Sequence, residues 1–176
     1  HGRPTEENAH PHTDCTGRMV VIHNGIIENY LALKERLAKA GHKFKSETDT
    51  EILVHLVEEK LHGAKGSAAL KEDAFFSAVR AALNEVVGAY AIAVMWSQAP
   101  GVLIAAKTSS PLVVGLGEGE NFLASDIPAV MDHTRSVVFL EDGDLAVHRR
   151  DRVEFFDLSG KPIAKTSCFG RLAASM

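Results

Sequence analysis

The strongest constraint on the fold is a change of pattern near residue 88 of this 176-residue chain. Before it, apolar residues recur mostly at helical spacing; after it, they form short runs separated by Gly, Pro or Asp-Gly. We predict a short helix over residues 127–131 and a series of antiparallel strands over residues 88–96, 102–106, 112–116, 121–124, 136–140, 144–148 and 153–156.

The first half of the chain supplies one early strand and the helices. Residues 1–17 have the composition of a loop, and residues 19–23 are an apolar run typical of a buried strand. We expect a first helix that starts near Glu28 or Asn29 and stops at Gly41, then a short extended segment over residues 42–44. A second helix opens within residues 46–51, and a third covers residues 74–86 after a connection over residues 63–70.

This order of elements predicts the α+β class, with helices packed on a sheet, but it does not fix the topology. The content of 45% hydrophobic and 24% charged residues is ordinary for a soluble globular domain. The 19 basic residues are scattered, so we expect no nucleic-acid partner. No apolar run approaches a membrane span and the polar start does not look like a secretory signal, so we expect a cytoplasmic protein that does not enter a membrane.

Asn24-Gly25 follows the early strand and has two interpretations. The dipeptide suits a tight turn, because both residues tolerate a positive φ. A side-chain amide next to a backbone N–H is also a donor pair of the kind that stabilises an oxyanion. The dipeptide alone favours the interpretation as a turn. The residues around it in the sequence favour the interpretation as a donor pair.

Other polar residues are ambiguous in the same way. Asp49 either caps the second helix or holds an ammonium group of a small ligand, and Thr48 with Glu51 has the spacing of a capping box. Four histidines of the first 23 residues could in principle bind zinc: His1, His10, His12 and His23. No metal-binding spacing occurs among them, and hydrogen bonds to loop backbone are the better interpretation. We therefore expect no metal and no cofactor. The far-separated Cys15 and Cys168 are best interpreted as reduced, inert thiols.

Six segments, taken in order, resemble the glutaminase domain of the glutamine–fructose-6-phosphate aminotransferase (glucosamine-6-phosphate synthase) family. They are HGRPTEENAHPH, VVIHNGIIENY, SETDTE, GAYAIAVM, SPLVVGLGEGENFLASD and FLEDGDLA. The resemblance implies an N-terminal-nucleophile hydrolase fold, a four-layer sandwich of two antiparallel sheets between helices, here incomplete. We expect residues 1–165 to be a partial glutaminase domain and residues 166–176 a tail that does not match.

The resemblance also implies a reaction and roles for four residues. Glutamine is hydrolysed at its side-chain amide, and the ammonia passes to fructose 6-phosphate bound on a sugar-isomerase domain. Asn24 and Gly25 would form the oxyanion hole, Asp49 would hold the α-ammonium of glutamine, and His1 would line the glutamine pocket. The nucleophile would be an N-terminal cysteine whose own α-amino group acts as base.

The sequence begins at His1, so we expect the nucleophilic cysteine to be absent from this chain and the chain alone to be inactive. The resemblance implies a homo-oligomeric parent enzyme. Two alternatives stay open: another type 2 glutamine amidotransferase, such as amidophosphoribosyltransferase, or an inactive fragment that binds glutamine or associates with itself.

Overall fold

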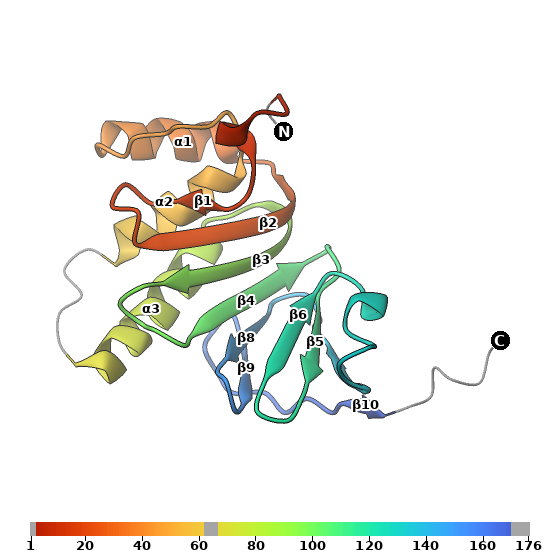
Figure 1. Ribbon diagram of the computed structural model, residues 1–176. Helices are drawn as coiled ribbons and strands as arrows, with labels where there is room; N and C mark the ends of the chain where they lie inside the picture. The colour runs from red at the N-terminus through yellow and green to blue at the C-terminus, as the bar shows by residue number, and fades with distance from the viewer. Residues whose placement is uncertain (1–2, 62–66, 170–176) are drawn as a thin grey trace.

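The computed structural model describes residues 3–61 and 67–169, and the chain folds into two antiparallel sheets and three helices (Figure 1). The larger sheet has six strands in the order β1-β2-β3-β4-β8-β9. These strands are β1 (His12–Thr13), β2 (Met19–Ile27), β3 (Gly88–Trp96), β4 (Leu103–Thr108), β8 (Asp144–His148) and β9 (Val153–Asp157). All neighbouring pairs in this sheet are antiparallel. This is the pairing that the sequence predicts for the strands after residue 88.

Three helices cover one face of the six-stranded sheet, as Figure 1 shows. They are α1 (Tyr30–Lys39), α2 (Thr50–Lys60) and α3 (Ala68–Leu83). Their apolar faces pack on every second residue of the strands, and the fully buried side chains include Leu37, Leu56, Phe75 and Ile104. Burying one such side chain contributes about 1.5–3 kcal/mol, so this layer supplies most of the hydrophobic stabilisation.

A smaller four-stranded sheet covers the opposite face of the larger sheet. Its order is β10-β7-β5-β6, and its strands are β10 (Cys168–Phe169), β7 (Ser136–Phe139), β5 (Val113–Leu116) and β6 (Asn121–Ala124). The larger sheet presents alanines to it, at Ala91, Ala105 and Ala146. The outer face of the smaller sheet is covered by the 3₁₀ turn η2 (Ile127–Ala129) and the residues that follow it.

This arrangement confirms the α+β class and the two-sheet sandwich, with its helical layer on one side. The predicted bounds of β3, β6 and β8 match the observed ones, and those of β4, β5, β7 and β9 differ by one or two residues at an end. The predicted strand over residues 19–23 is four residues shorter than β2. The helix α3 starts six residues before the predicted position, because Ser67 caps it and accepts a hydrogen bond from the amide of Leu70. Part of the predicted connection, residues 62–66, lies outside the described residues.

The N-terminal segment is more ordered than the predicted loop. It contains the 3₁₀ turn η1 (Glu6–Asn8) and strand β1, which pairs with β2. Residues 42–44, predicted as an extended segment, form no strand.

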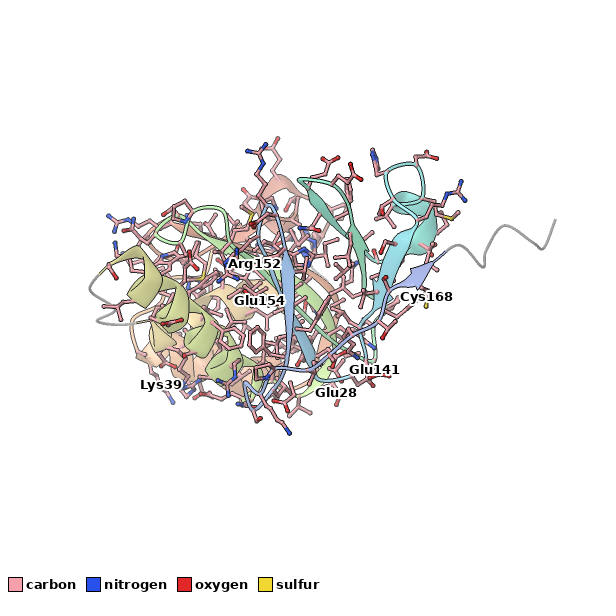
Figure 2. All side chains as sticks on the ribbon, turned by 90° about the horizontal axis from the view of Figure 1, so that it is seen from below. Glu28, Lys39, Glu141, Arg152, Glu154 and Cys168 are labelled. Atoms are coloured by element: carbon pink, nitrogen blue, oxygen red, sulfur yellow. The ribbon has the colours of Figure 1, made fainter. Side chains whose placement is uncertain are left out.

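The β9 edge of the larger sheet carries charged side chains. Glu154 of β9 forms ion pairs with Arg149 and Arg152, and Figure 2 shows Arg152 and Glu154 beside this edge strand. Charged side chains on an edge strand disfavour pairing with the sheet of another chain. No helix in the described part of the chain is both long enough and apolar enough to cross a membrane.

The predicted tight turn at Asn24-Gly25 is wrong. Strand β2 runs on through both residues to Ile27, and Asn24 and Gly25 lie opposite Ala91 and Tyr90 of β3. The long ladder of hydrogen bonds to β3 overrides the local turn preference of the dipeptide. A strand sends successive side chains to opposite faces, so His23 faces the helices and Asn24 faces the side of the smaller sheet.

The predicted capping box at the start of α2 is also wrong. The Glu51 carboxylate accepts hydrogen bonds from the amides of Lys45 and Ser46 and from the Ser46 hydroxyl. Burial opposes its charge, but the His55 ring and these donors lower the pKa of Glu51 to about 2. Glu51 therefore fixes the loop before the helix, at amides two and three residues before the Thr48 amide that the predicted capping box requires.

Candidate functional site

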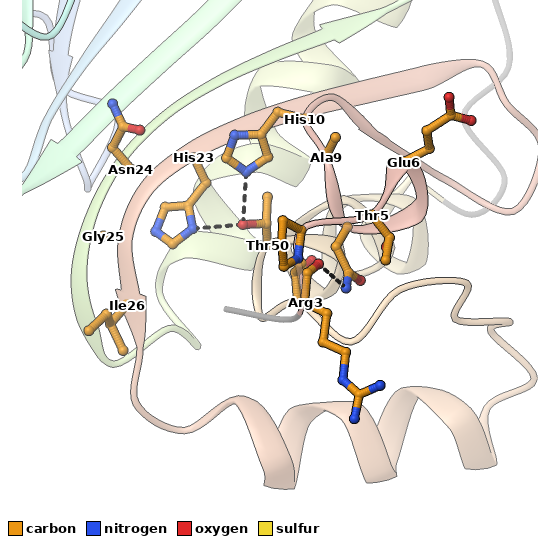
Figure 3. A pocket seen from close by; sticks show the side chains of 13 residues that line it. Arg3, Thr5, Glu6, Ala9, His10, His23, Asn24, Gly25, Ile26 and Thr50 are labelled. Atoms are coloured by element: carbon orange, nitrogen blue, oxygen red, sulfur yellow. Dashed lines mark hydrogen bonds between the residues drawn. The ribbon is translucent and has the colours of Figure 1, made fainter.

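A hollow of about 890 Å³ opens between the N-terminal segment, β2 and the start of α2. We call it the β2 hollow. It is lined by residues of the segment 3–10, by residues 23–26 of β2, and by Thr48 and Thr50. Figure 3 shows His10, His23 and Thr50 meeting on one wall, with Arg3 and Thr5 on the N-terminal segment. The predicted residues Asn24 and Gly25 both line it, whereas His1 lies outside the described residues.

The histidines of this wall bond to threonine hydroxyls, which corrects the expectation of bonds to loop backbone. The Thr50 Oγ1 lies 3.2 Å from His10 Nε2 and 3.1 Å from His23 Nδ1 (Figure 3). His12 Nε2 makes the equivalent contact with Thr48 Oγ1 at 3.0 Å. The start of α2 is thereby tied to β1, to β2 and to the N-terminal segment.

Burial sets the charge of these imidazoles. The pKa of His23 is lowered by burial, against the attraction of the nearby Asp49 carboxylate, and burial together with the neighbouring His10 lowers the pKa of His12. Both rings are therefore neutral at pH 7. His23 Nε2 is buried, and the backbone of Ala89 acts on this ring against the effect of burial.

Asn24 stands where the β2 hollow meets a second cavity. This cavity has a volume of about 290 Å³, lies between the two sheets, and is lined by Ala91 and Ala93 of β3 and by Leu123 of β6. The Asn24 Nδ2 donates to Ser125 Oγ at 3.4 Å, a long bond from an otherwise exposed side chain. A primary amide donor thus lines both cavities, and each of them has room for a small polar molecule.

Gly25 brings its backbone very close to β3. A Cβ at this position would lie 2.0 Å from the Ala89 carbonyl oxygen, and the φ of Gly25 is +134°. Only glycine fits such a contact without displacing backbone. Strand β2 is therefore distorted at Gly25, next to Asn24. The oxyanion-hole hypothesis requires a free backbone N–H at this same residue.

Asp49 occupies the N-cap position of α2 but makes no side-chain capping bond. Its Oδ2 accepts from the amide of Ile27 at 2.8 Å, which joins the start of the helix to the end of β2. Its Oδ1 is buried and makes no hydrogen bond within the described residues. This carboxylate oxygen has the properties needed to bind an ammonium group, although Asp49 does not itself line the β2 hollow as it stands.

Three further residues of this site lie within the quoted motif segments, but the sequence analysis gave none of them a role. Arg3 is the cation of the β2 hollow, Thr50 joins two histidines, and Ser125 reaches Asn24 from 101 positions away. The motif segments that contain them are far apart in the sequence, and the folded chain brings them together.

The comparisons with known proteins agree with this fold. Residues 3–132 match the family model of the glutamine amidotransferase domain. The chain therefore belongs to the glutamine amidotransferase domain family.

Curated relatives of this chain have a more specific name than the family. The chain is 53% identical to a glutamine–fructose-6-phosphate aminotransferase (isomerizing) of Thermus thermophilus, over 94% of this chain and 26% of that protein. It is 49% identical to the protein of the same name from Aquifex aeolicus, with the same two shares. The chain thus spans about a quarter of the length of these curated relatives.

Solved structures support the fold. A glutamine phosphoribosylpyrophosphate amidotransferase from B. subtilis superimposes with a TM-score of 0.70 at 22% identity, covering 91% of this chain and 34% of that chain. A glutamine aminotransferase class-II domain protein from Silicibacter pomeroyi gives 0.59 at 16% identity, with 84% of this chain and 70% of that chain covered. The fold is that of the N-terminal-nucleophile amidotransferases.

Proposed function

We propose that this chain is the larger part of the glutamine-hydrolysing domain of a glutamine–fructose-6-phosphate aminotransferase. The observation that carries the proposal is the position of Asn24 and Gly25 beside the β2 hollow, with Asn24 also lining the cavity between the two sheets. The identity of about 50% to proteins of that name supports the choice of reaction. The full-length enzyme would transfer the amide nitrogen of glutamine to fructose 6-phosphate, giving glucosamine 6-phosphate and glutamate.

In this proposal the reaction begins when a cysteine thiol attacks the side-chain carbonyl carbon of glutamine. The carbonyl oxygen becomes an oxyanion, and the Asn24 Nδ2 and the Gly25 N–H donate to it. Ammonia leaves, and water hydrolyses the thioester to glutamate. None of the described cysteines lines the β2 hollow, so the thiol belongs to a part of the enzyme outside the described residues.

The other proposed roles concern binding of glutamine. The free Oδ1 of Asp49 would accept a hydrogen bond from the α-ammonium, and His1 would line the pocket. Because Asp49 does not line the hollow in this structure, a small movement of the segment around Thr48 accompanies binding in this proposal.

Kinetics of the full-length enzyme test these roles. An oxyanion donor acts on charge that exists only in the transition state, so Asn24→Ala should lower kcat and leave KM nearly unchanged. Asp49→Ala removes a contact to an ammonium already present in bound glutamine, so it should raise KM. Circular dichroism would first establish that both variants fold. An Asn24→Ala enzyme with normal kcat, or failure of the enzyme to form glucosamine 6-phosphate, would overturn the proposal.

A further inference from the structure

Four side chains of metal-ligating type converge beside α2, and none of them lines the β2 hollow. They are Cys15, His42, His55 and Glu58, and one ligand atom from each lies within 4.8 Å of all the others. The Cys15 Sγ is 3.7 Å from His42 Nδ1 and 3.6 Å from His55 Nδ1. Both Nδ1 atoms lie 2.9 Å from the same carboxylate oxygen, Glu58 Oε2.

Three separate parts of the chain supply these four residues. His55 and Glu58 are three residues apart on α2 and so share one face of the helix. His42 follows the end of α1, where its amide donates to the Leu37 carbonyl at 3.0 Å. Cys15 lies in the turn between β1 and β2, so the cluster has no local spacing pattern that a sequence search would find.

The turn that carries Cys15 is held in place independently of the cluster. One Asp14 carboxylate oxygen accepts from the amides of Arg18 and Met19, and the other accepts from the Thr16 hydroxyl. Asp14 is buried and so fixes the loop around the exposed cysteine. A thiol ligand is thereby presented at the surface, where a metal ion from solvent can reach it.

The distances fit a tetrahedral zinc site. With Zn–S about 2.3 Å and Zn–N about 2.0–2.1 Å, a sulfur and a nitrogen of one tetrahedron lie about 3.6 Å apart. The two Cys15–histidine distances are 3.6 and 3.7 Å. The two histidine–Glu58 distances, 2.9 Å, are shorter than the roughly 3.3 Å of a zinc site because a hydrogen bond joins each pair here. To bind an ion, each of these two histidines would have to move only a few tenths of an ångström from Glu58, and all four ligand atoms already lie within 4.8 Å of one another.

The surroundings supply the outer contacts that such ligands need. The Lys43 amide donates to the Cys15 Sγ at 3.5 Å and so helps to fix the position of the sulfur. His55 is fully buried, and its Nε2 makes no hydrogen bond within the described residues. The nearest carboxylate oxygen to it is Glu51 Oε1, at 3.7 Å. With Nδ1 on a metal, the ring proton moves to Nε2 and faces this carboxylate, the usual outer partner of a metal-bound histidine.

We propose that Cys15, His42, His55 and Glu58 bind one Zn²⁺ per chain in a closed structural site. A thiolate with two imidazoles selects zinc over magnesium or calcium, and four protein ligands leave no open position for chemistry. Binding releases the thiol proton, and the thiolate and carboxylate together balance the two charges of the ion. The ion would clamp the β1–β2 turn and the loop after α1 onto α2, whose first residues form a wall of the β2 hollow.

Cobalt substitution of the purified 176-residue chain tests this site directly. After removal of metal with a chelator, Co²⁺ should bind at one equivalent and give the visible bands of tetrahedral cobalt together with a thiolate-to-cobalt charge-transfer band. Cys15→Ser should lose the charge-transfer band. Cys168→Ser is the matched control, because Cys168 is also a free exposed cysteine but lies on β10 of the smaller sheet (Figure 2). It should keep the full spectrum.

Zinc affinity, measured by competition with a chromophoric chelator, gives the second readout. We expect Cys15→Ser to weaken binding at least 100-fold and Glu58→Gln at least tenfold, with Cys168→Ser unchanged. A wild-type chain without the charge-transfer band would overturn the proposal, whatever the variants do. So would a Cys15→Ser chain that binds zinc like the wild type, or loss of the band in Cys168→Ser.

Discussion

The two faces of the six-stranded sheet are built differently. The helix-covered face has one continuous core of large side chains, including Phe75, Ile104 and Leu145. The face toward the smaller sheet has a core of far fewer residues, and three of them are alanines. Strand β2 continues past this smaller core, so that Ile22, Asn24 and Ile26 on this face are exposed.

This difference explains where the candidate site lies. The large side chains of the helix-covered face support the strands from behind, and the β2 hollow lies at the margin of this face, where the N-terminal segment and the start of α2 meet β2. The thinly packed face leaves the cavity next to Asn24 and Ala91. Stability therefore comes mainly from one face, while the donors of the site are presented on the other. Four experiments test this division.

The largest effect is expected for Gly25→Ala. The added Cβ would lie 2.0 Å from the Ala89 oxygen at a φ that alanine rarely adopts, so the free energy of unfolding should fall by about 4 kcal/mol. Gly41→Ala is the control, because its φ is also positive, at +100°, but nothing lies within 4 Å of the added atom. It should lose only about 1 kcal/mol. Urea unfolding measures both, and equal losses would show that the close approach at Gly25 relaxes freely.

The next effect falls on the rate rather than on stability. In the full-length enzyme, Asn24→Ala should lower kcat for glutamine hydrolysis roughly 100-fold, the loss of about 3 kcal/mol typical of one oxyanion donor. Ser125→Ala removes the 3.4 Å partner of Asn24 without removing the amide. We expect it to change kcat less than threefold, on the order of 0.5 kcal/mol. If both variants lost rate equally, Asn24 would matter through its contact with the smaller sheet.

His148 gives a pH test of the thinly packed face. Burial lowers the pKa of His148, on β8, to about 4, and its Nε2 makes no hydrogen bond within the described residues. Its unfolded pKa is near 6.5, so below that pH the unfolded state takes up the proton first. The contribution of the neutral His148 ring to the free energy of unfolding is therefore fully present above about pH 6.5. The free energy of unfolding falls by up to about 3 kcal/mol as the pH drops to 4.

His148→Leu removes this proton site while keeping an apolar side chain of similar volume. The difference in unfolding free energy between pH 7 and pH 4 should therefore be smaller in the variant, by up to the same amount. Other buried histidines, among them His12 and His23, leave a residual dependence in both proteins. Identical pH profiles for wild type and variant would mean that the ring of His148 is solvated.

The smallest effect compares identical changes on the two faces. Val94 packs in the core under the helices and Val114 in the core between the sheets, and both are almost completely buried. We expect Val94→Ala to cost about 2.5 kcal/mol and Val114→Ala about 1.5 kcal/mol, since the thinner core relaxes into neighbouring space. Thermal unfolding of the two variants measures the difference. A larger loss for Val114 would reverse the assignment of stability to the helical face.

The sequence by itself determined the class and most of the elements. Period-2 and period-3.6 patterns depend on neighbouring residues only, so residues 88–96, 121–124 and 144–148 were identified as strands with their observed bounds. The motif strings likewise identified the family. Local signals failed where a partner distant in sequence decides, as at Asn24-Gly25, which β3 holds in a strand against its preference for a turn.

Only the tertiary structure decided which side chains meet. His10 and His23 share the Thr50 hydroxyl, and Cys15 approaches His42 and His55, because α2 packs against β1 and β2 at once. The interpretation of Cys15 as an inert thiol considered its own loop alone. Its partners lie 27 to 43 residues away in sequence. Chemistry that depends on distances of 3–4 Å between remote residues is fixed by packing, and no local pattern contains it.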